Sequence, residues 1–183
     1  MKHLFTLFIC CAVLSNASSQ KLRKVDLGTS GCSVQFYGKS DDVKEVKGDG
    51  YKVYTVTAKT EEGNYGLVLK VHDKPFAKDS VAELRHLEQD MVDAEESFQV
   101  MELVSYGYDW KLKDFPEVKG ITTFWRDDEG IEYKVQGWTT SQISVIIYAG
   151  YPGDKQPNYD KINLFLQSFK FPSLEKKSNL SNK

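Results

Sequence analysis

Three runs of β-branched and aromatic residues, separated only by short polar turns, constrain the fold of this chain more than any other feature. They cover residues 121–126, 131–138 and 142–148, with an acidic turn at 127–130 after the first run. Connections this short join antiparallel strands, because a parallel crossover needs a dozen or more residues. The last run lacks alternation of apolar and polar residues, which is typical of a central strand covered on both faces.

A second antiparallel unit precedes these runs. Residues 51–59 are rich in Val, Thr and Tyr, residues 64–72 alternate strictly, and the four-residue connection between them ends in Gly63. This length and composition predict a β-hairpin. The alternation places Lys70 and His72 together on the face opposite to the apolar residues.

Two helices complete the pattern. Ser80 and Glu83 have the spacing of a capping box, and apolar residues recur at three- and four-residue steps as far as Phe98. Asn158 can cap a last helix whose apolar stripe is Ile162, Phe165, Leu166 and Phe169. Further expectations are short strands at 33–37 and 98–105 and loops at 39–50 and 106–120.

The order of strands, helix, strands and helix predicts an α+β fold with a mostly antiparallel sheet and helices packed on it. A length of 183 residues with 40% hydrophobic and 27% charged residues indicates a globular chain. We expect residues 20–172 to form a single domain and residues 173–183 to form a disordered tail, because the tail is polar and rich in Ser and Asn.

The first 19 residues have the composition of a secretory signal peptide. Lys2 and His3 precede an apolar run from Leu4 to Leu14, and small polar residues follow it. Cleavage after Ala17 or Ser19 is expected. The run is too short to span a bilayer, and no later segment is a candidate, so we expect an extracytoplasmic protein, periplasmic or secreted.

Charge and cysteine content exclude further classes. Removing residues 1–19 leaves 23 basic against 26 acidic residues, with no basic stripe, so nucleic acid is not an expected partner. Cys10 and Cys11 leave with the signal peptide. Cys32 is then alone, cannot form an intramolecular disulfide, and is expected to be a small buried residue at the start of a strand.

Three features together resemble the PsbP-like family of bacterial, chloroplast-lumen and nuclear-transport-associated domains. They are the Gly-x-x-Val-x-Phe strand at Gly31–Phe36, the long helix after the first hairpin, and Phe-Leu-x-Ser-Phe at Phe165–Phe169. The resemblance covers about residues 28–172. It implies an αβα sandwich with an extracytoplasmic, non-enzymatic role in binding or assembling other proteins. The photosystem members bind metal, but none of their ligands matches a residue of this chain.

A search for chemistry finds no complete catalytic or metal-binding motif. His86 and Asp90 are four residues apart on the first helix and can share a face, but a metal would need a third ligand, so a solvent-exposed His beside an acid is the favoured interpretation. His72 and Asp73 could act as base and orienting acid, without an implied nucleophile. We therefore expect no catalytic residues, no metal and no cofactor.

Aromatic residues give the candidate binding site. Phe124, Trp125 and Trp138 lie on predicted strands and are expected in the core. The segment 106–120 contains four more, in an expected loop where large aromatics often anchor partners. The candidate partner-binding residues are Tyr106, Tyr108, Trp110 and Phe115. The alternative is that this segment folds back over the sheet edge.

Two functions remain open. The first is a non-enzymatic binding or accessory module that contacts another protein or an envelope component, and that is itself expected to be a monomer. The second is a small extracytoplasmic hydrolase that uses His72 and Asp73, or a pair of carboxylates, in a cleft. A hydrolase requires polar side chains converging in a pocket, whereas a binding module requires an exposed aromatic or charged patch.

Overall fold

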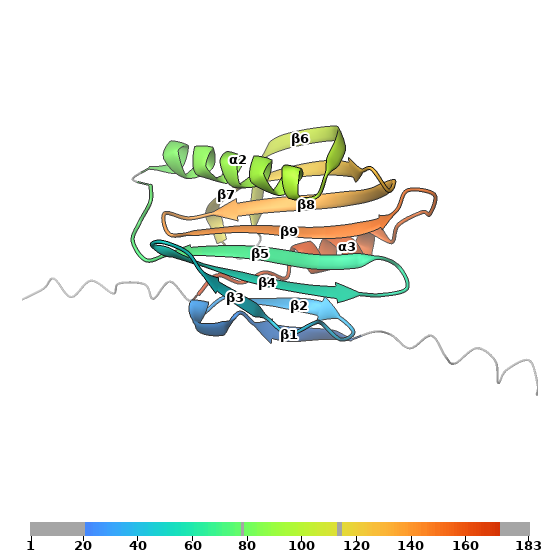
Figure 1. Ribbon diagram of the computed structural model, residues 1–183, viewed down its shortest axis with the longest axis horizontal. Helices are drawn as coiled ribbons and strands as arrows, with labels where there is room; N and C mark the ends of the chain where they lie inside the picture. Colours follow the sequence, from blue (N-terminus) through green and yellow to red (C-terminus); the bar gives the residue numbers. More distant parts are fainter. Residues whose placement is uncertain (1–20, 78, 113–114, 173–183) are drawn as a thin grey trace, which may run out of the picture.

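The computed structural model describes residues 21–77, 79–112 and 115–172. The expected signal peptide, its cleavage points and the expected tail lie outside these residues. Figure 1 shows a twisted sheet with helices packed against it. The strands are β1 (Leu22–Asp26), β2 (Ser33–Tyr37), β3 (Lys44–Lys47), β4 (Tyr51–Lys59), β5 (Asn64–His72), β6 (Val100–Leu112), β7 (Phe115–Asp127), β8 (Ile131–Thr139) and β9 (Ile143–Pro152); the helices are η1 (Gly28–Ser30), α2 (Ser80–Ser97) and α3 (Tyr159–Leu166).

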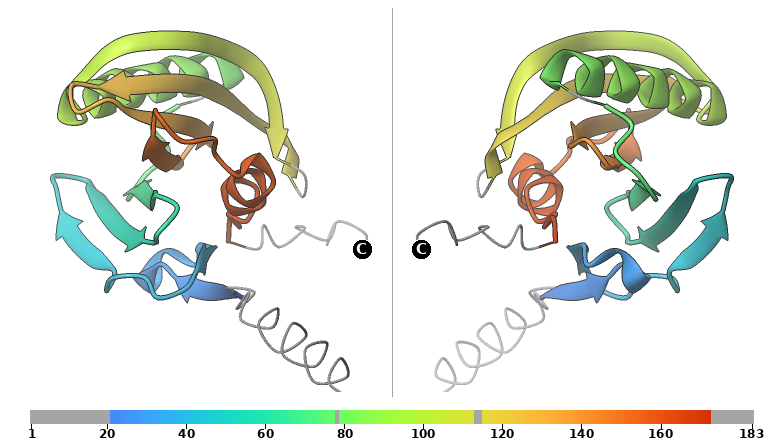
Figure 2. Two further views of the ribbon diagram at one scale, coloured as in Figure 1. Left: turned by 90° about the vertical axis from the view of Figure 1, so that its right-hand side faces the viewer. Right: turned by 90° about the vertical axis from the view of Figure 1, so that its left-hand side faces the viewer.

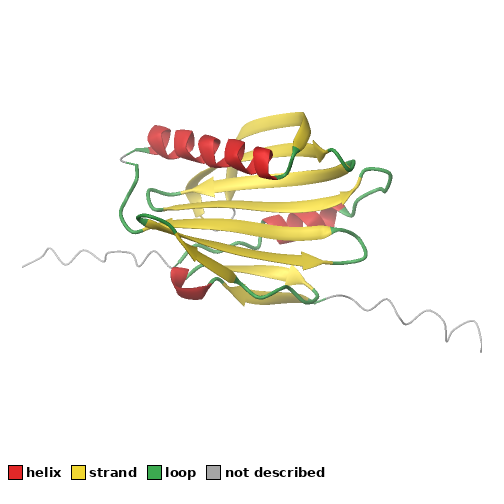
Figure 3. Cartoon of the chain, in the orientation of Figure 1, coloured by secondary structure: helices red, strands yellow, loops and turns green. Residues whose placement is uncertain are grey.

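Seven strands form one antiparallel sheet in the order β3-β4-β5-β9-β8-β7-β6, and β1 and β2 form a separate antiparallel pair. Figure 3 shows how far strands outweigh helices. The expected α+β class with a mostly antiparallel sheet is therefore confirmed. The predicted hairpin is also confirmed, since Tyr51 pairs with His72 and Lys59 with Asn64. The strand expected to be central, β9, lies between β5 and β8.

The two faces of the sheet carry different layers. On one face, α2 contributes Leu87 and Met91 to a hydrophobic cluster with Trp125 and Val135. On the other face, α3 and the β1-β2 pair cover a larger cluster, in which the Phe36 and Phe165 rings lie 5.0 Å apart. The sheet is thus buried on both sides near β8 and β9, where continuous apolar sequence is needed.

The expectation of a loop at 106–120 is wrong, because β6 and β7 pair along this segment as far as Leu112 and Phe115. Gly120 and Gly107 indicated a loop, yet both lie inside strands. A Cβ at Gly120 would come within 2.3 Å of the Trp138 ring and 2.4 Å of the Gly137 carbonyl oxygen. Gly120 also faces both Asp109 and Trp110 across a bulge, so glycine here permits close packing within the sheet.

The β6-β7 hairpin bends around the end of the molecule. In Figure 2, β6 runs from beside α2 over the top of the sheet to the side that carries α3. The packing agrees with this path, because Val100 and Trp125 belong to the cluster under α2, whereas Leu112 belongs to the cluster that contains α3.

Other expectations need smaller corrections. The expected loop at 39–50 contains the strand β3. The strand β1, which pairs with β2, was not expected because its sequence does not alternate apolar and polar residues. Asp79 rather than Ser80 caps α2: its carboxylate accepts hydrogen bonds from the Val81 and Ala82 amides at 2.9 Å. Val81 is exposed, so the apolar stripe of α2 begins at Leu84. The second helix is capped by Asn158 as predicted.

Candidate functional site

Edge strand β6 exposes large apolar side chains over half of its length. They are Met101 (75% exposed), Leu103 (51%), Val104 (54%), Tyr106 (38%) and Tyr108 (49%). The rings of Tyr106 and Tyr108 lie 4.8 Å apart, edge to face. Two of the four candidate partner-binding residues are therefore exposed, on a strand rather than on a loop. Isolated exposed apolar residues are ordinary on protein surfaces, but five of them within eight residues of one strand indicate an interaction site.

Two bulges determine which side chains of β6 face α2. The pairing of β6 with β7 skips one residue between Val100 and Glu102 and another between Leu103 and Ser105. As a result Leu103 pairs with Trp125 and Tyr106 pairs with Thr123, and cross-strand partners share a face. In a regular strand, residues three apart would point to opposite faces. The bulges therefore gather these side chains on the face that carries α2.

A groove lies between α2 and the start of β6. Its volume is about 370 Å³. The helix contributes Val92 together with carboxylates, and the strand contributes apolar side chains. The lining residues are Val92, Glu95, Glu96, Gln99, Val100, Met101, Glu102 and Leu103. The structure thus places exposed apolar side chains of β6 beside carboxylates of α2.

The carboxylates of the groove have different surroundings. Glu95 is half-buried and accepts a hydrogen bond from the Trp125 indole at 3.1 Å. Burial raises the pKa of Glu95 above its ordinary value, and the hydrogen bond from Trp125 opposes this rise. Glu102 lies 2.6 Å from the Arg126 guanidinium. In the described part of the chain, neither Glu95 nor Glu96 has a Lys or Arg partner, so the helix side of the groove is negative.

The remaining aromatic candidates do not join this patch. Phe115 is half-buried and packs on Phe171, with ring centroids 5.4 Å apart, in the cluster that contains α3. The side chain of Trp110 lies outside the described part of the chain. Trp125 and Trp138 are fully buried, as expected, and Phe124 is half-buried. The patch therefore consists of Leu103, Tyr106 and Tyr108 with Met101 and Val104 beside them, and we call these five residues the β6 patch.

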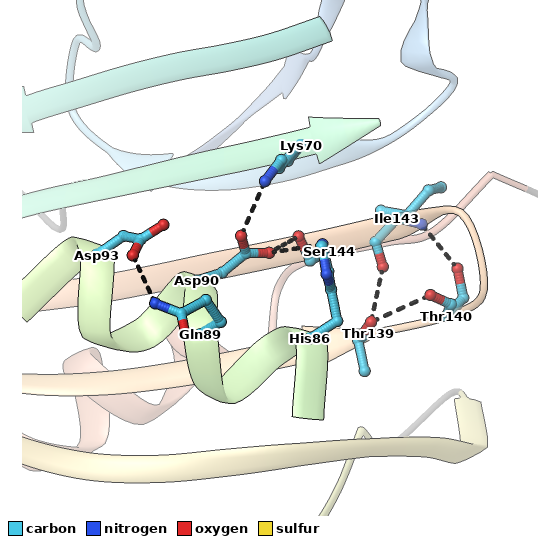
Figure 4. Close-up of polar contacts among 9 residues, drawn as sticks. All are labelled: Lys70, His86, Gln89, Asp90, Asp93, Thr139, Thr140, Ile143 and Ser144. Atoms are coloured by element: carbon cyan, nitrogen blue, oxygen red, sulfur yellow. Dashed lines mark hydrogen bonds and ion pairs between the residues drawn. The ribbon is translucent and has the colours of Figure 1, made fainter. Parts of the chain in front are cut away.

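A polar cluster lies on the same side of the sheet, beneath α2 (Figure 4). Asp90 of α2 accepts a hydrogen bond from the Lys70 ammonium of β5 at 3.0 Å and one from the Ser144 hydroxyl of β9 at 2.5 Å. The Asp90 side chain is only 11% exposed. Three elements that are distant in the sequence are thus joined by one carboxylate, which fixes α2 to the centre of the sheet.

The two histidines of the described chain meet beside this cluster. Their ring centroids are 5.2 Å apart, and Phe76 packs against both rings. His86 Nε2 is 3.5 Å from an Asp90 oxygen, so the predicted helix pair exists, but the side chain is only 28% exposed and the expectation of a solvent-exposed His86 is wrong. Burial, followed by the neighbouring His86 and Lys70, lowers the pKa of His72.

A cavity of about 200 Å³ opens between this cluster and the C-terminal half of α2. Lys70, Asp90, Asp93 and Ser144 contribute polar atoms, and Val68, Phe98 and Ile146 are among its apolar walls. The Ser144 hydroxyl donates to a carboxylate rather than to a histidine. In the described chain no hydrogen bond joins the side chains of His72 and Asp73. The arrangement therefore contains a possible carboxylate pair but no nucleophile and base in contact.

Sequence reasoning missed how these residues come together. Lys70 and His72 were correctly assigned to one face of β5, and His86 and Asp90 to one face of the helix. The sequence indicates a polar face on the strand and another on the helix. It does not indicate that these two faces oppose each other in the fold. Among the described residues, no three His, Cys, Asp or Glu side chains are arranged to hold a metal ion.

Cys32 lies immediately before β2, where it is 1% exposed and forms no disulfide. Burial raises the pKa of its thiol to about 11, despite an opposing hydrogen bond with Ser30. The thiolate is therefore scarce at neutral pH, and the prediction of a buried, structural cysteine is confirmed.

Comparison of the chain with protein-family models finds no matching family, and comparison with curated protein sequences finds no similar protein. Within the described ranges, no helix combines the length and the apolar character that crossing a membrane requires.

Proposed function

We propose that this protein is a non-enzymatic binding module that contacts another protein through the β6 patch. The observation that carries the proposal is the run of exposed apolar side chains on an edge strand. Leu103 and Tyr106 are held on one face by the bulge at Val104, so the patch is a built surface rather than a frayed end. Large, rigid aromatic side chains such as Tyr108 are common anchors of protein interfaces because they bury much area at little entropic cost.

A photo-crosslinking amino acid at position 108 tests this proposal in the protein's native setting. Tyr159 provides a matched control, since it is a tyrosine of α3 with 48% exposure against 49% for Tyr108, and each packs against another tyrosine ring. We expect a discrete crosslinked partner from position 108 and none from position 159. Leu103→Ser should abolish that crosslink without changing the melting temperature. Equal crosslinking from both positions would contradict the proposal.

The proposed module is extracytoplasmic, and its proposed arrangement is a PsbP-like αβα sandwich. The signal-peptide composition of residues 1–19 supports the first point. The seven-stranded antiparallel sheet with α2 and α3 on opposite faces supports the second. Sequencing of the mature N-terminus should begin at Ser18 or Gln20. A mature protein that retains Leu4–Leu14 would contradict the proposed extracytoplasmic location.

A hydrolase is the second candidate, since Asp90 and Asp93 line one cavity with Lys70 and Ser144. Two carboxylates in different surroundings can act as acid and base. The Lys70 ion pair and the Ser144 hydrogen bond already occupy Asp90, which favours a structural role. A panel of chromogenic esters and glycosides separates these roles: turnover that Asp93→Asn abolishes would support the hydrolase, and an inert wild-type protein would exclude it for those substrates.

A further inference from the structure

We infer that the groove between α2 and β6 binds a cationic segment of the partner protein, one that alternates Lys or Arg with apolar side chains. This inference rests on the proposed function and names the chemistry of the partner. It is argued from the charge of the groove, the polarity of the helix end and the position of the apolar side chains.

The first observation is an excess of negative charge on the helix wall of the groove. Glu95 and Glu96 both line it, and neither is paired with a Lys or Arg among the residues described. Burial raises the pKa of the Tyr106 phenol most, followed by Tyr108, and the charges of Glu88 and Glu95 add to this rise. Glu88 therefore lies on the same side of α2 as Glu95. A buried carboxylate without a counter-ion is unfavourable, and the raised pKa of Glu95 reflects that cost.

The second observation is that these acids lie where the helix itself disfavours them. The C-terminal end of a helix carries a partial negative charge, which basic residues normally offset. The last turn of α2 has no basic residue and contains Glu95 and Glu96. Gln99, which follows the helix and lines the groove, adopts a positive φ of 52°, uncommon for a residue other than glycine. A left-handed residue commonly ends a helix, so the unusual feature here is the charge: the acids lie where a basic residue would be favoured.

The third observation indicates that the ligand carries apolar as well as basic side chains. The opposite wall is mostly apolar: Leu103 and Met101 line the groove and are 51% and 75% exposed. Its one carboxylate, Glu102, is paired with Arg126. Val92, 46% exposed, lies on the helix side among the acids. A purely basic partner would leave these side chains in water, and a purely apolar partner would bury the carboxylates without counter-ions. A segment with both kinds of side chain satisfies both walls.

Fluorescence anisotropy with a defined probe tests the inference. The probe is a labelled twelve-residue peptide that alternates Lys and Leu; the control peptides alternate Glu with Leu and Lys with Ser. We expect the Lys-Leu peptide to bind most tightly. Glu95→Gln with Glu96→Gln should weaken its binding about tenfold, taking about threefold for each exposed charge pair. The glutamine at position 95 retains an oxygen that can accept from Trp125.

Matched variants distinguish this site from overall charge. Asp49→Asn with Glu61→Gln removes the same charge from exposed turns at the ends of β4 and should change the affinity less than twofold. Leu103→Ser should weaken binding as strongly as the groove pair. Urea unfolding midpoints confirm that each variant is folded.

Each other outcome overturns the inference in a different way. If both charge pairs weaken binding equally, the attraction is not specific to the groove. If Leu103→Ser abolishes binding while the groove pair changes nothing, the partner is apolar and the proposed function survives. If Leu103→Ser changes nothing, the proposed function fails as well. If the protein alone sediments as a dimer that Leu103→Ser dissociates, a second copy of the chain occupies the groove.

Discussion

The two edges of the seven-stranded sheet are protected in different ways. At one edge, β3 is four residues long, with the sequence Lys-Glu-Val-Lys, and Val46 is its only apolar residue. At the other edge, β6 is thirteen residues long and carries the β6 patch. Short, charged edges prevent pairing with other strands, as Lys44 and Lys47 do here. β6 has no comparable charge between Leu103 and Tyr108.

The comparison indicates how β6 can remain apolar without inviting strand addition. Its bulges next to Met101 and Val104 interrupt the regular spacing that an added strand would need. The backbone is therefore a poor template, while the side chains remain available. A partner of this edge should be recognised through side chains in the groove rather than through a continuous ladder of main-chain hydrogen bonds.

The two edges differ most in the side chains that support them. Trp125, fully buried under α2, supports β6, whereas half-buried Val53 supports β3. Trp125→Ala should lower the free energy of unfolding by about 3–5 kcal/mol, because a large cavity forms and Glu95 loses its indole partner. Val53→Ala should cost about 1 kcal/mol or less. Urea titration measures both, and similar losses would remove the asymmetry.

The ion pairs under α2 and at the β3 edge also differ in exposure. Asp90 is shielded and joins Lys70 and Ser144, whereas the Glu45–Lys52 pair at the β3 edge is about one-third exposed, with its charged atoms 3.4 Å apart. Asp90→Ala should lower the free energy of unfolding by about 2–3 kcal/mol. This loss is smaller than that for a fully buried ion pair, because Lys70 is 25% exposed and can be hydrated. Glu45→Ala should leave the unfolding free energy unchanged. An equal loss from both variants would contradict the central role of Asp90.

Smaller effects are expected within the β6 patch. Tyr108→Ala removes an exposed ring that contacts Tyr106, so the loss of unfolding free energy should stay at about 1 kcal/mol or below. Partner crosslinking should nevertheless fall, since an interface anchor contributes mainly to the complex. Differential scanning calorimetry provides the stability measurement. A strongly destabilised variant would show that Tyr108 belongs to the core rather than to a binding surface.

The pH dependence of stability should have opposite signs on the two sides of α2. His72, whose pKa is lowered from 6.5, binds protons less readily when folded, so stability is complete above about pH 6.5 and falls as the pH drops below it. Glu95, whose pKa is raised from 4.5, binds protons more readily when folded, so its contribution is present below pH 4.5 and is lost as the pH rises through its folded pKa. His72→Phe and Glu95→Gln should each remove one slope from a pH series of unfolding curves; an unchanged profile would refute the assignment.

Periodicity predicted the elements in which one face is buried. The alternation in β5 and the stripe of α3 record burial directly, since Leu67, Leu69, Ile162 and Phe165 all lie in the core. The same logic failed for β1 and β3, which are short and mostly exposed. Their sequences carry little burial pattern to detect.

The candidate site was predictable only in part. The sequence makes Tyr106 and Tyr108 candidates because they are large aromatics in an expected loop, which Gly107, Pro116 and Gly120 indicate. The two residues are exposed, but they lie on a strand. Whether a glycine marks a turn or a close approach depends on its neighbours, here Trp138. The shared face of Leu103 and Tyr106 depends on a bulge, for which the local sequence gives no signal.

The bent β6-β7 hairpin also links the two hydrophobic clusters into one cooperative unit. Trp125 and Ile121 belong to the cluster under α2, whereas Val118 and Leu112 belong to the cluster with α3, all within a single pair of strands. Opening either cluster therefore disturbs the strands that complete the other. Amide hydrogens in the middle of β7 and β8 should exchange only through global unfolding, while those of the short β3 edge exchange through local opening. We expect the strand that carries the β6 patch to be anchored to the part of the molecule that opens least.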